Sequence, residues 1–447
     1  MNSRTKLLTL IIAGVVVVTA AAIVLATTLN RPKEVAKPDP VAATVPVALD
    51  AEGLPEDFSI GVVMTFGSSG EPGSEYNRAA QGAVVAAQRF AQEGTSVDLP
   101  TRNDSGTEDG ARAAVRALAD EGVSGIVVAS TGPQAVAAAK AAEELGLPAV
   151  LPYDEPVGPA PSTWSTKPSA ASVENALGAA LAGKNRVLLV ADGGEVPASV
   201  QVAQTFNLAD FEDITVLAQD AAVQTGDQPL PLAEDAPEDT VAMNVAEPAD
   251  AVILSAATPQ RLARLVQALQ SRNVSVPLVL PAGATSPAFA TALTELDGTI
   301  SGQLVTVAPA GGDGTALQQD AQGRGMSAFL SAVRLAAGES TVHNLTVDAP
   351  FSGDAWAADT ASHDAVVALV RAAATAESSV PAEVGAMLRT MSFGPGEGMA
   401  GSALDFSQSN ALAVEATPVY ASPQDLGLRP PAEEAPRLVC VPAPAAP

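Results

Sequence analysis

Small hydroxyl side chains follow two short apolar runs of the sequence. Ser68 and Ser69 come shortly after the run IGVVM. Ser130 and Thr131 directly follow the run GIVVA. Where a buried strand ends and a helix begins, such hydroxyls can donate hydrogen bonds to an anionic group, and the helix dipole favours the same charge. The same residue types also serve as helix caps and turn residues, so the pattern indicates two candidate binding loops and leaves the capping role open.

Side chains suited to metal or catalytic chemistry are scarce. The 447 residues include two His and one Cys, which cannot supply the usual zinc sites or a disulfide. The segment GEGMAG at 396–401 has the spacing of a dinucleotide loop, but it leads into an expected strand instead of a helix. His363 and Asp364 are adjacent, yet no G-x-S-x-G elbow accompanies them. We therefore expect no catalytic residue, no metal and no cofactor, and we expect that the protein is not an enzyme.

The charge balance is strongly acidic, with 23 Lys and Arg against 50 Asp and Glu and a formal net charge of −27. A chain of this charge cannot neutralise a phosphate backbone, so we exclude nucleic acid as a partner. The hydrophobic content of 47% argues against a disordered chain. The acidity is compatible with a cationic solute, and equally with an ordinary solvated surface.

The N-terminal segment 7–29 carries no charge and is long enough to cross a bilayer as a helix. Arg4 and Lys6 precede it, which predicts a cytoplasmic N-terminus and a folded body outside the cell. We expect residues 1–29 to be a single-pass membrane anchor; the alternative is a cleaved signal peptide and a secreted protein. A lipoprotein is excluded, because acyl attachment needs a cysteine directly after the signal and the single cysteine is Cys440. Proline-rich segments at 30–57 and 422–447 predict a linker and a tail.

Between these flanks, apolar runs alternate with helical patterns. Short runs without polar alternation, at 58–64, 97–99, 125–129 and 149–151, predict buried parallel strands, and helices are predicted at 74–93, 107–121 and 134–145. The pattern restarts at 186–191, followed by an expected helix at 196–208 and expected strands at 214–217, 251–254 and 276–280. This order predicts an α/β chain with two doubly wound sheets, which bind ligands beyond the carboxyl ends of their strands.

The order of several segments resembles one known family. The segments are IGVVMTFGSSG with GAVVAAQRF, then RNDSGTEDGARAAVRALADEGVSGIVVASTGPQAVAAAKAAEELGLPAVLPY, then DAVILSAATPQRLARLVQALQ, GQLV and SFGPGEGMAGSALDF. Together they resemble the type I periplasmic solute-binding proteins, in the leucine/isoleucine/valine-binding branch that serves ABC transporters. The resemblance implies two lobes joined by three crossovers, near Thr166, Val305 and Phe393. Lobe 1 would comprise 58–166 and 307–392, and lobe 2 would comprise 167–306 and 393–421, with a hinge that closes on a solute.

The resemblance also implies where a ligand would bind. The family holds an amino-acid carboxylate with lobe 1 hydroxyls and N–H groups, and the ammonium with acidic and tyrosine side chains of lobe 2. Ser68, Ser69, Ser130 and Thr131 match the lobe 1 loops.

Other loops depart from the pattern of the family. Tyr153, Asp154 and Glu155 stand where small residues and a threonine are usual, and two acids there would repel a carboxylate, unless they form only an exposed turn. Glu195 lies on the lobe 2 loop where a tyrosine is expected. The usual ammonium-binding residues are missing from lobe 2, so the fold carries over and the branched-chain amino acid does not.

These expectations combine into one functional prediction. The protein would be a membrane-tethered, extracytoplasmic solute-binding protein that closes on a small solute for an ABC importer. The solute would be amino-acid-like, an amide, a polyamine or a short peptide. The alternative is a degenerate module of the same fold that acts as an envelope sensor or scaffold without transport.

Overall fold

The computed structural model describes residues 46–67, 72–194, 197–232, 237, 240–309, 311–422, 424, 426–431 and 438–442. The expected membrane anchor at 7–29 lies outside these residues. Within the described ranges, no helix is both long and apolar enough to cross a membrane.

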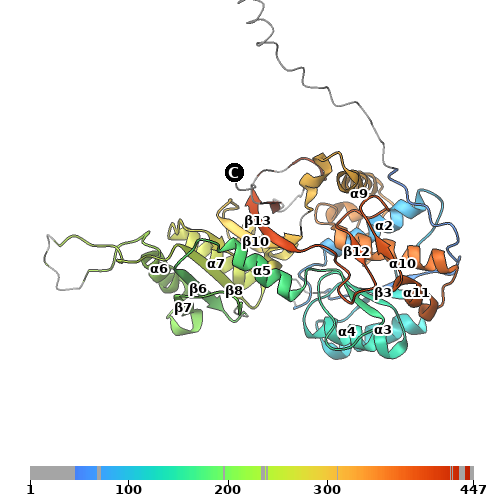
Figure 1. The fold of residues 1–447 in the computed structure, drawn as a ribbon, viewed down its shortest axis with the longest axis horizontal. Coiled ribbons are helices and arrows are strands. Elements are labelled where there is room, and N and C mark those ends of the chain that lie inside the picture. The colour runs from blue at the N-terminus through green and yellow to red at the C-terminus, as the bar shows by residue number, and fades with distance from the viewer. Residues whose placement is uncertain are drawn as a thin grey trace, which may run out of the picture. The chain divides into compact units, whose positions relative to one another are not determined.

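The first sheet has five parallel strands in the order β2-β1-β3-β4-β5, and its central strand β3 is labelled in Figure 1. The strands are β1 (Ile60–Met64), β2 (Thr101–Asn103), β3 (Gly125–Val128), β4 (Ala149–Leu151) and β5 (Thr163–Ser165). Every residue of β1, β3 and β4 is buried, because helices cover both faces of the sheet. The predicted parallel sheet is confirmed, with its second strand a few residues later than expected.

Six helices pack on this sheet: α2 (Gly82–Ala91), α3 (Glu108–Asp120), α4 (Pro133–Leu145), α9 (Ala321–Gly338), α10 (Thr360–Ala376) and α11 (Pro381–Leu388). Helices α3 and α4 share a core with one face, while α2, α9, α10 and α11 share a core with the other. Helix α3 begins where the Thr107 side chain accepts a hydrogen bond from the Gly110 N–H. We call this sheet and its helices the first sheet group.

The second sheet has seven strands in the order β14-β13-β10-β9-β8-β6-β7. The strands are β6 (Val187–Asp192), β7 (Gln204–Asn207), β8 (Ala251–Ala256), β9 (Leu278–Val279), β10 (Leu304–Pro309), β13 (Ala416–Ser422) and β14 (Val439–Pro442). Strands β6 to β10 are parallel to one another. Strand β13 runs antiparallel to β10, and β14 runs antiparallel to β13. The helices of this second sheet group are α5 (Ala170–Ala180), α6 (Ile214–Gln224), α7 (Pro259–Ser271) and α8 (Pro287–Glu295).

Short elements complete the described chain. They are the 3₁₀ turns η1 (Ala79–Gln81), η2 (Leu208–Asp210), η3 (Ala282–Thr285), η4 (Asp313–Leu317) and η5 (Phe351–Gly353), and the two-stranded ribbon of β11 (Ser392–Phe393) and β12 (Leu404–Asp405).

Two expectations for the second sheet group were wrong. The segment expected as a strand at 214–217 begins helix α6, because the Asp213 carboxylate accepts hydrogen bonds from the Thr215 and Val216 N–H groups and caps a helix there. The segment expected as a helix at 196–208 instead supplies the edge strand β7, which pairs with β6.

The chain passes between the two sheet groups after β5, after β10 and before β13. The first two passages lie near the expected positions, Thr166 and Val305. The third lies later than Phe393, because Phe393, Leu404 and Phe406 pack in the core of the first sheet group.

The proline-rich tail expected at 422–447 is also folded in part. Strand β14 pairs with β13, which adds an edge strand to the second sheet. The Arg429 guanidinium binds both carboxylate oxygens of Asp313, at 2.7 and 3.0 Å, and donates to the Ala358 carbonyl oxygen. The C-terminal segment therefore contacts both sheet groups, which its proline content did not predict.

Candidate functional site

A cavity of about 620 Å³ lies where the carboxyl ends of strands from both sheets meet. Its walls include Thr131 after β3, Tyr153 after β4, and Thr166 after β5. From the second sheet it takes the segment after β8, the η3 turn after β9, and the end of β10. Parallel α/β sheets bind ligands at this edge, since strand ends and helix starts leave backbone groups and loop side chains free to converge there.

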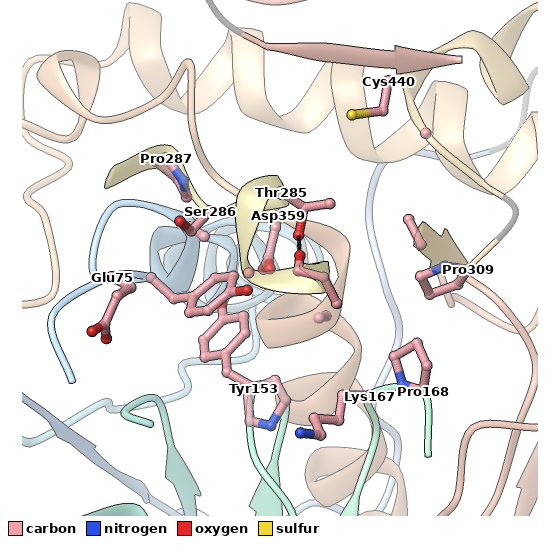
Figure 2. A pocket seen from close by; sticks show the side chains of 18 of the residues that line it. Glu75, Tyr153, Lys167, Pro168, Thr285, Ser286, Pro287, Pro309, Asp359 and Cys440 are labelled. Carbon is pink, nitrogen blue, oxygen red and sulfur yellow. Dashed lines mark hydrogen bonds between the residues drawn. The ribbon is translucent and has the colours of Figure 1, made fainter. Parts of the chain in front are cut away.

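Two stacked tyrosines form one wall of the cavity (Figure 2). The rings of Tyr76 and Tyr153 lie 4.3 Å apart and are inclined by 8°. Burial raises the pKa of Tyr76 to about 12 and raises the pKa of Tyr153 well above 10, because a phenolate would lose its hydration. Both phenols are neutral at physiological pH and offer an aromatic surface with polar tips.

Asp359 lies on the same wall and begins helix α10. Its Oδ1 accepts hydrogen bonds from the Ser362 N–H at 2.9 Å and from the Ser362 hydroxyl at 2.7 Å. Burial raises the pKa of Asp359 to about 6, although these hydrogen bonds and the nearby Arg429 act in the opposite direction. The helix cap thus places a carboxylate of unusually weak acidity in the cavity.

Glu75 and Lys167 supply further charges at the cavity. The Thr131 hydroxyl donates a hydrogen bond to a Glu75 carboxylate oxygen at 2.8 Å. The Lys167 ammonium lies 3.7 Å from a Glu155 carboxylate oxygen, which makes a partly exposed ion pair. The hydroxyl of Thr131 is therefore bound to an acid, and the positive charge of Lys167 is already matched.

Ser130 does not line the cavity. Its hydroxyl is fully buried and donates to Asp104 Oδ2 at 2.7 Å. The Thr65 hydroxyl donates to Asp104 Oδ1, also at 2.7 Å. Asp104 thus joins the loops that follow the neighbouring strands β1, β2 and β3. The Ser130 hydroxyl already donates its hydrogen bond to Asp104 and is not available to donate to a ligand.

Of the remaining residues predicted from the sequence, some line the cavity and others do not. Thr131 and Tyr153 line the cavity. The Asp154 carboxylate accepts from the N–H groups of Gly132 and Glu155, at 2.6 and 2.7 Å, so it joins its own loop to the start of α4. Glu155 lines a separate small pocket of about 100 Å³. Ser68, Ser69 and Glu195 lie outside the described residues.

Glu75, Tyr76 and Asp359 line the cavity but were not predicted from the sequence. The segment AADTASHD carried one usable signal, since Asp359 precedes an alanine-rich helix in an N-cap position. A cap in itself does not predict a binding site, and Glu75 and Tyr76 precede their helix in a loop without a recognisable motif. In the described part of the chain, no three His, Cys, Asp or Glu side chains are grouped closely enough to hold a metal ion.

Comparisons with known proteins identify the fold. No protein-family model matches the chain, and no curated protein matches it. Among solved structures, a leucine-binding protein of Thermotoga maritima superposes with a TM-score of 0.56 at 15% identity, over 81% of this chain and 95% of that chain. A branched-chain amino acid transporter substrate-binding protein of Streptococcus pneumoniae, in complex with isoleucine, superposes with a TM-score of 0.56 at 16% identity, over 86% of this chain and 99% of that chain.

A third similar structure has a different ligand. A solute-binding protein of an ABC transporter from Rhodopseudomonas palustris, in complex with benzoate, gives a TM-score of 0.53 at 15% identity, over 87% of this chain and 98% of that chain. These matches agree with the resemblance seen in the sequence, and at such identities they establish the architecture alone. The chain therefore has the fold of the type I periplasmic binding proteins.

Proposed function

We propose that this protein binds a small solute in the cavity between its two sheet groups and delivers it to an ABC importer. The cavity itself carries the proposal: about 620 Å³ is enough for a small organic molecule, and its walls come from the ligand-binding edges of both sheets. The similar structures are solute-binding proteins, in some cases with isoleucine or benzoate bound, which supports the same role here.

The test is thermal unfolding of the purified full chain with a panel of amino acids, amides, aromatic acids, amines and short peptides. A solute that binds only the folded state raises the melting temperature in a saturable way, because binding adds RT ln(1 + [L]/Kd) to stability. We expect one chemical class to do so. If no class shifts the transition, the alternative gains support, in which the module is a sensor or scaffold that no longer binds a solute.

We also propose that segment 7–29 anchors the chain in the cell membrane, with the folded body outside the cytoplasm. The uncharged length of this segment and the positive charges before it support the proposal. In cells, we expect protease added from outside to digest the body while the chain fractionates with membranes. A soluble protein whose N-terminus, determined by mass spectrometry, lies near residue 27 would indicate a cleaved signal instead.

A further inference from the structure

We infer that the solute of this cavity is an organic cation that carries no carboxylate. The inference rests on the proposed solute-binding function and specifies its ligand class. It comes from the charges on the cavity wall, from polar groups that the protein leaves unsatisfied there, and from the aromatic and apolar remainder of the lining.

The cavity wall carries more acidic than basic side chains. Glu75, Asp313, Asp359 and Asp364 line it, while Lys167 is the basic side chain among its lining residues in the described part of the chain. Lys167 already lies 3.7 Å from Glu155. A ligand carboxylate would therefore meet more negative than positive charge, and it would have to share Lys167 with Glu155.

Two of the four acids are compensated within the protein. Asp313 binds the Arg429 guanidinium through both oxygens. Asp364 accepts from the N–H groups of Ala400 and Gly401, at 2.9 and 2.8 Å, and lies 2.7 Å from His363 Nδ1. These contacts are structural, so neither acid is expected to bind the solute.

Glu75 and Asp359 remain as the acids able to receive a cation. Glu75 accepts a hydrogen bond from the Thr131 hydroxyl, and Asp359 accepts hydrogen bonds from the Ser362 N–H and hydroxyl. Arg429 influences Asp359 electrostatically, but its guanidinium is bound to Asp313. Both residues line the same cavity as the stacked Tyr76 and Tyr153, and Figure 2 labels Glu75, Tyr153 and Asp359 there.

Unsatisfied polar atoms on the same wall point independently to a ligand. The Thr166 side chain is 7% exposed, and its hydroxyl oxygen has no hydrogen-bond partner among the residues that the structure describes. The Tyr153 hydroxyl lies near Asp359 and Ser362 but makes no hydrogen bond of normal geometry with a described residue. Leaving such groups buried without a partner costs free energy, which a polar solute would recover, since each hydroxyl can accept a hydrogen bond from the ligand or donate one to it.

The rest of the lining suits the body of such a solute. Tyr76, Tyr153 and Trp356 bring aromatic rings to the wall, and alanine and proline residues supply most of the remainder. Electron-rich ring faces attract ammonium groups, especially where water is excluded. An amine with an apolar or aromatic body satisfies all three features of the cavity.

Isothermal titration of the full chain with matched probes tests the inference. Each set shares one carbon body: 2-phenylethylamine, 3-phenylpropanoate and phenylalanine; 3-methylbutylamine, 4-methylpentanoate and leucine; and 1,5-diaminopentane with heptanedioate. We expect an amine to bind at least tenfold more tightly than the acid and the amino acid of its set. The variants Glu75→Gln and Asp359→Asn should each weaken that amine at least tenfold.

The control variant is Asp109→Asn, which removes an equal charge from a fully solvated site whose side chain is 99% exposed. Its amine affinity should stay within twofold of the parent, and urea unfolding verifies that all variants are folded. An acid or amino acid that binds more tightly than its matched amine would overturn the inference and leave the proposed function intact. No binding by any probe class would overturn the proposed function, and the inference with it.

Discussion

Replacing Asp359 by Asn should make the protein more stable at pH 8. The carboxylate is held in a largely dry site, so its ionised form is unfavourable, and the pKa is raised from 3.8 to about 6. Asparagine caps helices as well as aspartate does and can still accept both hydrogen bonds from Ser362. The substitution therefore removes the charge and keeps the cap.

The magnitude follows from the difference between the folded and unfolded pKa. A rise from 3.8 to about 6 corresponds to about 3 kcal/mol of unfavourable free energy when the group is fully ionised. By surface area Asp359 is half-buried and faces the cavity, so the burial that raises its pKa is incomplete and water screens part of this cost. We expect Asp359→Asn to raise the free energy of unfolding at pH 8 by about 1 to 3 kcal/mol.

The dependence on pH distinguishes this cause from better packing. A raised folded pKa means that the folded state binds the proton more tightly than the unfolded state. The resulting stability is fully present below about pH 4 and is lost as pH rises through about 6. The groups that contribute to this titration are Tyr153, Ser362 and Arg429. The advantage of the variant should therefore vanish near pH 4 and reach its full size above pH 7.

Urea unfolding followed by circular dichroism, at intervals from pH 4 to pH 8, measures this difference. A matched control is Asp213→Asn, at the start of α6, where backbone hydrogen bonds hold the pKa of a solvated carboxylate below its usual value. That variant should show no gain at pH 8. Equal or lower stability of Asp359→Asn at pH 8, or a gain that is the same at every pH, would refute the reasoning.

Three further substitutions test other parts of the structure. Arg429→Met should lower the free energy of unfolding by about 3 to 5 kcal/mol, because it removes the guanidinium that binds both oxygens of the buried Asp313 carboxylate; adding Asp313→Asn should restore much of the loss in urea titrations. Ser130→Ala should cost about 1 to 2 kcal/mol through the lost hydrogen bond to Asp104, yet leave solute affinity in calorimetry unchanged, since the hydroxyl lies off the cavity. Gly82→Ala should cost about 3 kcal/mol by thermal or urea unfolding, because a Cβ there would lie 2.0 Å from a backbone oxygen of the loop before α10.

Each of these has a result that contradicts it. An Arg429→Met protein as stable as the parent would show that the C-terminal segment does not hold the fold. A tenfold loss of affinity in Ser130→Ala would return this serine to the binding site. Unchanged stability of Gly82→Ala would mean that the helix and loop can separate without cost.

The parallel sheets were predictable because their strands are short, wholly apolar runs. The segments GVVM and GIVV have no solvated face, so they fit only a sheet covered on both sides. Local polar contacts defeated the prediction elsewhere. The β-branched start of α6 is typical of a strand, but the Asp213 cap and the alanines that follow make it a helix. The prediction of an unfolded tail failed for a different reason. The pairing of β14 depends on the edge of β13, which other parts of the chain position.

The candidate site was predictable only where it follows a strand. Thr131 and Tyr153 come directly after apolar runs, and both line the cavity. Chemistry alone could not separate Thr131 from its neighbour Ser130, because successive residues of an extended chain point in opposite directions. Glu75 and Asp359 come from segments far apart in sequence, which the packing of α10 against η1 and α2 brings together.

The single cysteine of the chain lies at the cavity rim on β14 and is half-buried (Figure 2). A polarity-sensitive fluorophore attached to its sulfur would sense solvent entry and exit at this rim without any engineered mutation. The native chain thus offers a single attachment point for an optical reporter. A change in the emission colour of the attached fluorophore on titration would reveal ligand-dependent rearrangement even where calorimetric heats are too small to measure.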